Sequence, residues 1–440
     1  MSFVYGCATG WLSPTLPLLQ SADPAVGTTS ITEEETAWLS SLPFLGALVA
    51  SPIFSFICQS YGRKAGGYFT AIPFMASWIL IMFANTIPQL YIARFLAGLA
   101  YGGTIVFVPM YTGEIAEDNI RGALGAFLPL LCNLATVFTY SLGPYVSIQM
   151  LAIVCFIPTT IFLFVFFWLP ETPTYLISKE NTEMASQSML WLRGNIREIA
   201  EKDLQKVKDL LQKKDPSSKK STRALLFSRG TLKALTICLV VCIAQQFSGV
   251  YIILNYCTEI MSKSASALSP SIASISVAAI QLLGAILATF CVEVFGRRIM
   301  LIFSQAVMGL CLAVLGTYFY FQDQGYDMTS LSVLPIICVS LYLFTNATGV
   351  APITYILISE TLHPDIRGIA TTIATSNIWA LAFLITTLYP VLLGLLGLAG
   401  CYWAFASVCV FCIIFTIFQI PETKNRSLQS ILDELNGVKT

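Results

Sequence analysis

The sequence predicts an all-α membrane protein of twelve transmembrane helices, arranged as two pseudo-symmetric six-helix halves with a cytoplasmic helical linker between them. Three observations predict this fold class: a shortage of charge, the number of long apolar stretches and the repetition of three short motifs. Of the 440 residues, 56% are hydrophobic and 11% are charged, whereas a soluble globular chain carries about 25% charged residues. A buried core alone does not explain so large a deficit of charge.

Twelve stretches are long and apolar enough to cross a bilayer, which takes roughly 20 residues of helix. Apolar character begins at Phe3 without the basic start or the cleavage site of a secretory leader, so we predict a retained first span. Prolines weaken some stretches, but membrane helices tolerate them better than soluble helices do. The predicted spans are approximately 2–20, 37–59, 65–85, 88–112, 122–143, 146–169, 232–259, 269–293, 298–320, 331–358, 368–393 and 398–420.

One polar region separates spans six and seven. Its lysines and arginines alternate with acidic residues, and the spacing of apolar residues between Leu204 and Leu211 predicts a short amphipathic helix. That helix is either solvated along its charged face or in contact with lipid headgroups. We therefore predict an N-terminal half at 1–173, a linker at 174–230, a C-terminal half at 231–422 and a cytoplasmic tail at 423–440.

Basic residues are unevenly distributed along the predicted topology. With the linker placed in the cytoplasm, only Arg94 and Lys263 of the 24 lysines and arginines fall away from the cytoplasmic face. Cytoplasmic loops of membrane proteins carry this excess of positive charge. We therefore predict a multi-pass protein of the plasma membrane with both termini in the cytoplasm.

The sequence gives no sign of enzymatic chemistry. Most of the 13 cysteines lie in apolar runs, His363 is the single histidine, and no phosphate-binding glycine loop is present. We expect no cofactor, no metal and no enzyme activity. Since the formal net charge is zero, nothing indicates nucleic acid as a partner; the expected partners are the lipid bilayer and a small solute, with no obligate protein partner evident.

Three motifs occur twice, in the same order in each half. Gly-Arg and a further basic residue follow spans two and eight; a glutamate, six residues and Arg-Gly link spans four and five and spans ten and eleven; Pro-Glu-Thr follows spans six and twelve. The repeat indicates a duplicated six-span unit, the architecture in which two halves rock around a site at the membrane midplane. The motifs occupy 62–64, 114–122 and 170–172 in the first half and 296–298, 360–368 and 421–423 in the second.

The repeated motifs place arginines and glutamates at the cytoplasmic helix ends. We predict a gating charge network in which the two halves pair there when the inner side is closed. Exposed pairs contribute about 0–1 kcal/mol each, which suits a latch that opens in every cycle. The alternative, that positive charge only sets topology, leaves the ordered glutamates unexplained. The predicted network comprises Arg63, Lys64, Glu114, Arg121, Glu171, Glu293, Arg297, Arg298, Glu360, Arg367 and Glu422.

Further motifs are Arg-Phe-Leu-Ala-Gly at 94–98, Pro-Met-Tyr at 109–111 and Gln-Gln-Phe-Ser-Gly at 245–249. With these motifs, the chain resembles the sugar-porter family of the major facilitator superfamily over essentially its whole length. Within that family, the asparagine at position 133 resembles the residue found in the insect facilitated trehalose transporter branch. The resemblance implies a substrate held between the halves by amide and aromatic side chains. Tyr251 stands where the family has asparagine, Asn255 where it has an aromatic residue, and Tyr355 where it has tryptophan. The implied substrate-binding residues are Asn133, Gln245, Gln246, Tyr251, Asn255, Gln281, Tyr355 and Asn377.

The chemistry of amides agrees with this assignment. An amide donates and accepts hydrogen bonds at once, as a hydroxyl does, and leaving either unpaired in a dry site costs about 1–3 kcal/mol. An amide-lined site therefore selects polyhydroxylated ligands. For a single glutamine within a span, a hydrogen bond between helices is the competing role.

Charge within the spans bears on the mechanism. Only Arg94 lies clearly inside a span, and spans one, four and seven carry no acidic residue at midplane depth. Proton coupling needs a titratable group, so its absence favours facilitated diffusion of a neutral solute. Gly98 and Gly102, four residues apart, predict close helix contact.

We therefore predict facilitated, uniport transport of a neutral sugar, trehalose or a hexose, by alternating access. Two alternatives stay open: a non-transporting sugar sensor of the same fold, and a carrier of another neutral polyol or small molecule.

Overall fold

The computed structural model describes residues 1–440 except 22, 118, 213–228, 265–267, 362–366, 425, 427–429, 432–433 and 435–440. Within helices, it describes only the backbone of residues 210–212, 229, 293, 359 and 367–370. The side chains of Glu293 and Arg367 therefore lie outside the described residues. All regular elements in the described ranges are helices, as the sequence predicts.

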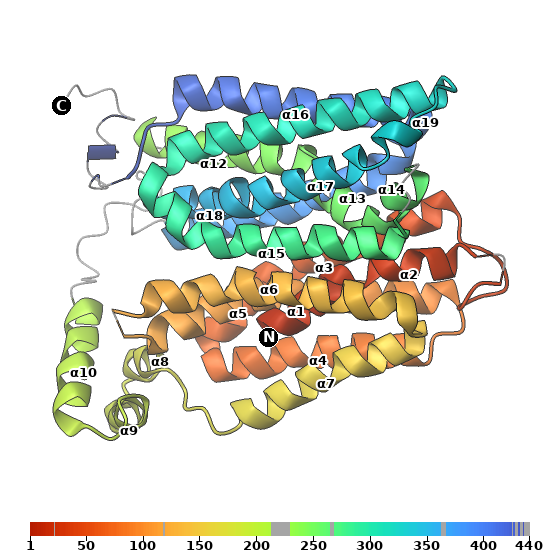
Figure 1. The fold of residues 1–440 in the computed structure, drawn as a ribbon. Coiled ribbons are helices and arrows are strands. Elements are labelled where there is room, and N and C mark those ends of the chain that lie inside the picture. The colour runs from red at the N-terminus through yellow and green to blue at the C-terminus, as the bar shows by residue number, and fades with distance from the viewer. Residues whose placement is uncertain are drawn as a thin grey trace.

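The helices form two bundles and a small group between them in the chain (Figure 1). The first bundle contains α1 (Ser2–Gly10), α2 (Leu12–Leu19), α3 (Glu33–Ser60), α4 (Arg63–Met82), α5 (Ile87–Ile115), α6 (Arg121–Leu142), the short η1 (Gly143–Tyr145) and α7 (Ile148–Phe166). The linker group contains α8 (Pro173–Ser178), α9 (Thr182–Leu192) and α10 (Arg197–Gln212). The second bundle contains α12 (Arg229–Phe247), α13 (Val250–Asn255), α14 (Cys257–Lys263), α15 (Pro270–Phe295), α16 (Arg297–Asp323), η3 (Thr329–Leu331), α17 (Leu334–Thr345), η4 (Asn346–Val350), α18 (Ala351–Thr361) and α19 (Arg367–Gln419).

In the part of the chain that is described, ten helical stretches are long and apolar enough to cross a membrane. The first predicted span is bent at Trp11 into α1 and α2, of nine and eight residues, which are each too short to count alone. The 53-residue α19 contains a non-helical kink at Gly397, with φ of 69°. Counting α1 with α2 as one bent span and α19 as two gives the twelve spans that the sequence predicts.

Spans seven and ten, predicted as continuous, are interrupted. Span seven breaks between α12 and α13 at Gly249, whose φ of 85° is left-handed and whose Cα faces the Phe405 ring, 2.6 Å from where a Cβ would lie. Only glycine adopts this conformation readily at so close an approach. In span ten, a π-helical turn at η4 joins α17 to α18, and such turns are frequent at functional sites.

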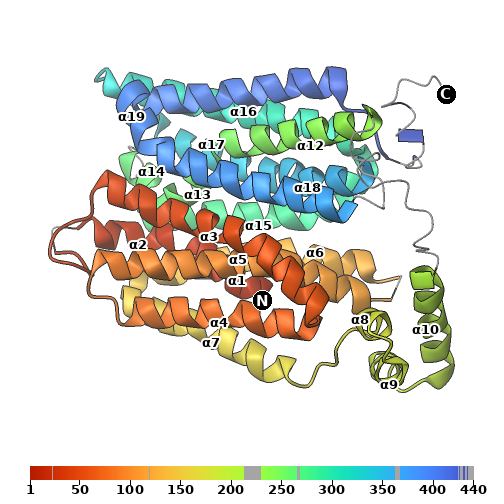
Figure 2. The same ribbon diagram turned by 180° about the vertical axis from the view of Figure 1, so that it is seen from behind.

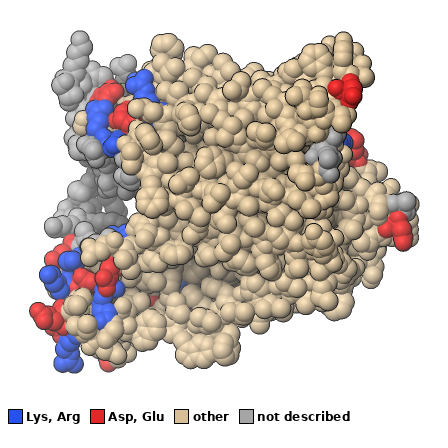
Figure 3. All heavy atoms as spheres, in the orientation of Figure 1, with Lys and Arg blue, Asp and Glu red and all other residues tan. Residues whose placement is uncertain are grey.

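The two bundles lie side by side, with α3 along α19 and α6 along α15 (Figures 1 and 2). The linker helices lie beyond one end of the first bundle, which we call the linker end. In Figure 3, the charged residues gather at the two ends, mostly the linker end, and an uncharged band separates them. This distribution is that of a protein whose middle lies in the hydrocarbon of a bilayer.

Glycines allow a close helix contact within the first bundle. A Cβ at Gly98 would lie 2.2 Å from the carbonyl oxygen of Pro43, and one at Gly102 would lie 2.7 Å from that of Ala47. The backbones of α3 and α5 therefore touch, which confirms the predicted role of this glycine pair. The linker helices have a small core of their own, made of Leu176, Ala185, Met189, Ala200 and Leu204.

Candidate functional site

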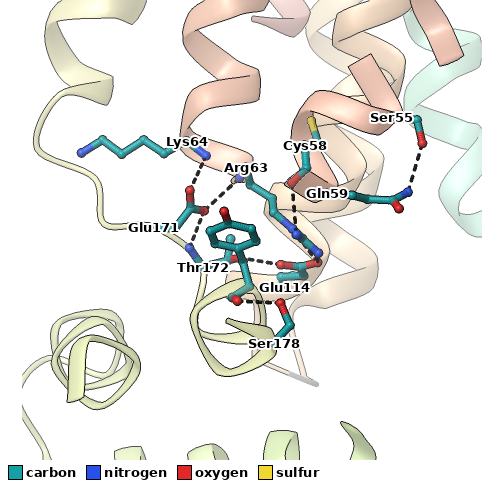
Figure 4. Close-up of polar contacts among 10 residues, drawn as sticks. Ser55, Cys58, Gln59, Arg63, Lys64, Glu114, Glu171, Thr172 and Ser178 are labelled. Carbon is teal, nitrogen blue, oxygen red and sulfur yellow. Dashed lines mark hydrogen bonds and ion pairs between the residues drawn. The ribbon is translucent and has the colours of Figure 1, made fainter. Parts of the chain in front are cut away.

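A cluster of charged groups joins three segments of the first bundle at the linker end (Figure 4). Arg63, the first residue of α4, donates from Nε and Nη2 to Glu114 Oε1 of α5, at 3.0 and 2.7 Å. Glu171, which follows α7, accepts from the backbone N–H groups of Arg63 and Lys64 at 3.1 and 2.9 Å. The Thr172 hydroxyl donates to the other oxygen of Glu114 at 2.6 Å.

The second bundle repeats the arrangement of this cluster with the equivalent residues. Arg297 Nη2 donates to Glu360 Oε1 at 2.9 Å. Glu422 accepts from the N–H groups of Arg297 and Arg298 at 3.0 and 3.1 Å, and the Thr423 hydroxyl donates to Glu360 at 2.6 Å. The duplicated motifs in the sequence therefore form duplicated structures.

The glutamates act as caps on helix N-termini. The first N–H groups of a helix lack intrahelical acceptors, and a carboxylate there is also favoured by the helix dipole. Gly62 and Gly296, with φ of 107° and 83°, precede α4 and α16, and a Cβ at either would lie 2.2 or 2.8 Å from the capping carboxylate. The Gly-Arg motif thus requires glycine for both the turn and the approach of the glutamate.

The two capping glutamates differ in their proton affinity. Burial raises the pKa of the Glu171 carboxyl above its ordinary value, and the N–H donors around it offset this only in part. Burial also acts on Glu422, but there the N–H groups of Lys424, Arg297, Arg298 and Thr423 outweigh it and the pKa is lowered.

Glu171→Gln and Glu422→Gln are expected to respond to acid with opposite signs. The lowered pKa of Glu422 gives the parent chain a stability advantage above the ordinary glutamate pKa of about 4.3, which is lost as the pH falls through the lowered value. The raised pKa of Glu171 means that its ionised form costs stability at neutral pH. The stability of the parent chain relative to Glu171→Gln therefore rises as the pH falls through the raised value. Thermal unfolding midpoints in detergent at a series of pH values from neutral to acid measure both differences. Parallel pH slopes for the two variants would contradict the opposite shifts.

The remaining residues of the predicted network take simpler positions. Lys64 Nζ donates to the Phe167 carbonyl at 2.8 Å, Arg298 donates to the Ile417 carbonyl, and Arg121 is exposed at the start of α6. Each contact described above joins residues of one bundle. Pairing between the bundles therefore stays a prediction, for a state in which their linker ends meet.

At the end opposite the linker, the bundles touch. Ser13 Oγ of α2 lies 3.0 Å from Thr258 Oγ1 of α14, and the Tyr140 hydroxyl donates to the Leu254 carbonyl at 2.6 Å. The ring of Phe44 lies 4.5 Å from that of Tyr251, measured between centroids, and stacks on Trp379 at 6.2 Å. The structure is therefore closed at this end.

Five of the six predicted binding amides share one property: a buried polar atom with no hydrogen-bond partner among the described residues. Such an atom normally finds a partner, and leaving it unpaired costs about 1–3 kcal/mol. The glutamines are less than a tenth exposed. The atoms are Gln245 Oε1, Gln246 Oε1, Asn255 Nδ2, Gln281 Oε1 and Asn377 Oδ1, from α12, α13, α15 and α19.

The other predicted binding residues are placed differently. Asn133 Nδ2 donates to the Pro129 carbonyl of its own helix at 2.8 Å. Tyr251 is half-buried against Phe44, and Tyr355 keeps 40% of its surface exposed. Sequence reasoning missed Phe44 and Trp379, for which no motif gave a signal, and gave no role to Thr172 and Thr423, although their repetition in Pro-Glu-Thr was a signal.

Comparison with known proteins gives a consistent picture. A family model described as sugar (and other) transporter matches residues 1–435. Facilitated trehalose transporter Tret1 of Bombyx mori is 30% identical over 97% of this chain and 83% of its own length; that of Polypedilum vanderplanki is 29% identical over 99% and 86%. The chain spans about half the length of the Drosophila yakuba protein of the same name, at 29% identity over 99% of this chain. The inward-open xylose transporter XylE from E. coli has the same fold, with a TM-score of 0.80 and 21% identity over 98% of this chain and 96% of XylE.

Proposed function

The chain belongs to the sugar (and other) transporter family, and on this basis we propose that it carries a neutral sugar, trehalose or a hexose, across a membrane by facilitated, alternating-access transport. The observation that carries the proposal is that five of the predicted binding amides, all on helices of the second bundle, each have a buried atom with no hydrogen-bond partner among the described residues. Sugar hydroxyls both donate and accept hydrogen bonds, so they can pair with either the oxygen or the nitrogen of an amide side chain. The names of the relatives support trehalose as the first sugar to test.

The charge distribution supports uniport. Neither Glu114 nor Glu360 lies at mid-bundle: both are bound to arginines at the linker end. Arg94, inside the first bundle, is a cation that stays charged at any physiological pH. Transport of an uncharged solute down its gradient needs no proton-binding group within the spans.

We also propose the orientation and the membrane. The linker end carries most of the basic residues in Figure 3, and such ends face the cytoplasm. We propose that both termini are cytoplasmic and that the membrane is the plasma membrane. In the structure itself, α1 begins inside the first bundle and not at the linker end (Figure 1). The division into halves at 1–173 and 231–422, with a linker at 174–230 and a tail at 423–440, remains our proposal for the domains.

Proteoliposomes containing the purified chain test the proposal. Radiolabelled trehalose and glucose are each offered with and without an imposed proton gradient. We expect saturable uptake of one of them that stops at equal concentrations and does not change with the gradient. Uphill uptake driven by protons would contradict uniport, and sugar binding without any exchange flux would favour a sensor.

Gln245→Ala is expected to raise the sugar concentration for half-maximal uptake about tenfold, which corresponds to the loss of roughly 1.4 kcal/mol of binding free energy. The reason is the removal of a buried amide that the sugar would satisfy. Gln305→Leu is the matched control, because Gln305 is a fully buried amide on α16 that belongs to no motif implying binding. Equal losses of affinity in both variants, at equal amounts in the membrane, would count against the assigned site.

A further inference from the structure

Arg94 is buried inside the first bundle, with 3% of its surface exposed. Its Nη1 donates to the Ala8 carbonyl at 2.8 Å, its Nε donates to the Leu39 carbonyl at 3.0 Å, and its Cζ lies 5.5 Å from the centre of the Trp11 ring. None of the ion pairs formed within the described residues includes Arg94. The cation is therefore held by main-chain oxygens and an aromatic face.

Each of the two carbonyls lies at a position where its own helix supplies no backbone N–H donor for it. Leu39 precedes Pro43 by four residues in α3, and proline has no N–H to give to the carbonyl one turn earlier. Ala8 lies in the last turn of α1, where carbonyls have no intrahelical donors. Since a buried carbonyl without a donor is costly, Arg94 on α5 stabilises two interruptions on two neighbouring helices.

The break at Trp11 separates two segments with different neighbours: α1 packs mainly within the first bundle, whereas α2 packs against both bundles. On its first side, α1 lies in backbone contact with α6, since a Cβ at Gly6 would be 2.2 Å from the Cys132 carbonyl oxygen. On its other side, α2 is bonded to the second bundle, because Ser13 Oγ accepts from the Thr258 N–H at 3.1 Å and contacts its hydroxyl. When the bundles part at this end, the bonds of Ser13 must break.

We infer that Arg94 is a positioning residue for transport: its guanidinium holds the end of α1 on α3 and α5, so that α2 turns about Trp11 as the end opposite the linker opens. The inference rests on the proposed function only for the sugar that moves. Arg94, bound to backbone carbonyls, keeps the bend of the first span at Trp11 in place.

Arg94→Lys, alone and with Pro43→Ala, tests the inference. The lysine keeps the charge but replaces the planar fork, which reaches both carbonyls, with a single ammonium. Pro43→Ala returns an N–H donor to the Leu39 carbonyl, so residue 94 then needs to donate only to the Ala8 carbonyl. We expect Arg94→Lys to lower exchange turnover about tenfold with half-saturation changed less than about twofold, and Pro43→Ala to recover most of the loss. Pro52→Ala, at another proline of α3, is the matched control and should recover none.

A Ser13→Cys reporter follows the opening without any sugar. The residue is 1% exposed in the closed state, so a membrane-impermeant maleimide added from the side opposite the linker reacts with it only after opening. We expect faster labelling in Arg94→Lys and a return towards the parent rate with Pro43→Ala. Because no substrate is needed, failure here is distinct from failure of the proposed sugar transport.

Two results would overturn the inference: no rescue by Pro43→Ala, or equal rescue by Pro52→Ala. If Arg94→Lys alone does not accumulate in the membrane, the double variants supply the comparison. Accumulation with Pro43→Ala and not with Pro52→Ala then supports the inference, and failure of both pairs contradicts it.

Discussion

Gly98→Ala is expected to prevent the close packing of α3 on α5 and to remove most of the folded protein from the membrane. The added Cβ would lie 2.2 Å from the Pro43 carbonyl oxygen and 2.7 Å from its Cα. Overpacking costs about 1–3 kcal/mol where side chains can adjust, and we expect about 3 kcal/mol or more here because both partners are backbone. The amount of protein in the membrane and the thermal unfolding midpoint in detergent measure the effect.

Gly113→Ala is the matched control on the same helix. A Cβ there has nothing within 4 Å, and alanine is favoured over glycine in a helix by about 0.5–1 kcal/mol. Gly113→Ala should therefore raise the unfolding midpoint slightly. A comparable loss in both variants would show that the contact with Pro43 is not the cause.

Arg63→Met is expected to lower the free energy of unfolding by about 3 kcal/mol, because it leaves the Glu114 carboxylate partly buried without its cation. The two side chains are 13% and 18% exposed, and their closest approach is 2.7 Å. Removing the charge of the partner as well, in Arg63→Met with Glu114→Gln, should recover much of the loss. A double-mutant cycle on thermal stability gives the coupling between the two residues.

Lys263→Met provides the comparison at an exposed ion pair. Lys263 lies 2.8 Å from Glu259 but is 46% exposed, and such pairs contribute about 0–1 kcal/mol. A loss as large as that of Arg63→Met would mean that burial does not determine the cost. An additive result in the Arg63 and Glu114 cycle would contradict their direct pairing.

The membrane fold could be predicted because its signals are local or repeated. Apolar length defines a span, and the repeated Gly-Arg, Glu-x6-Arg-Gly and Pro-Glu-Thr motifs mark equivalent helix ends in both halves. Gly98 and Gly102 indicated a close contact through their spacing alone. The breaks at Trp11 and Gly249 were harder to predict. Glycine and proline are common in membrane helices, and the sequence does not indicate which of them interrupts a helix.

The partners of charged residues depend on three-dimensional proximity. The sequence showed that Glu171 and Glu422 recur at equivalent loops, but it did not show that each caps the helix of its own bundle. For Arg94, no acidic partner could be found in the sequence, because the acceptors are the carbonyls of Ala8 and Leu39. Carbonyls belong to every residue, so only the fold distinguishes those that have lost their donors.

The five predicted binding amides that have a buried atom without a hydrogen-bond partner in the described part of the chain all belong to the second bundle, and this asymmetry has a consequence for how cargo is retained. A sugar bound to them loses few of its polar contacts when the first bundle moves away at either face. We therefore expect the second bundle to keep the sugar bound while the first bundle moves to open and close each side of the site. Affinity measured from the two sides of the membrane should then be nearly equal, because the same amides would bind the sugar from either side.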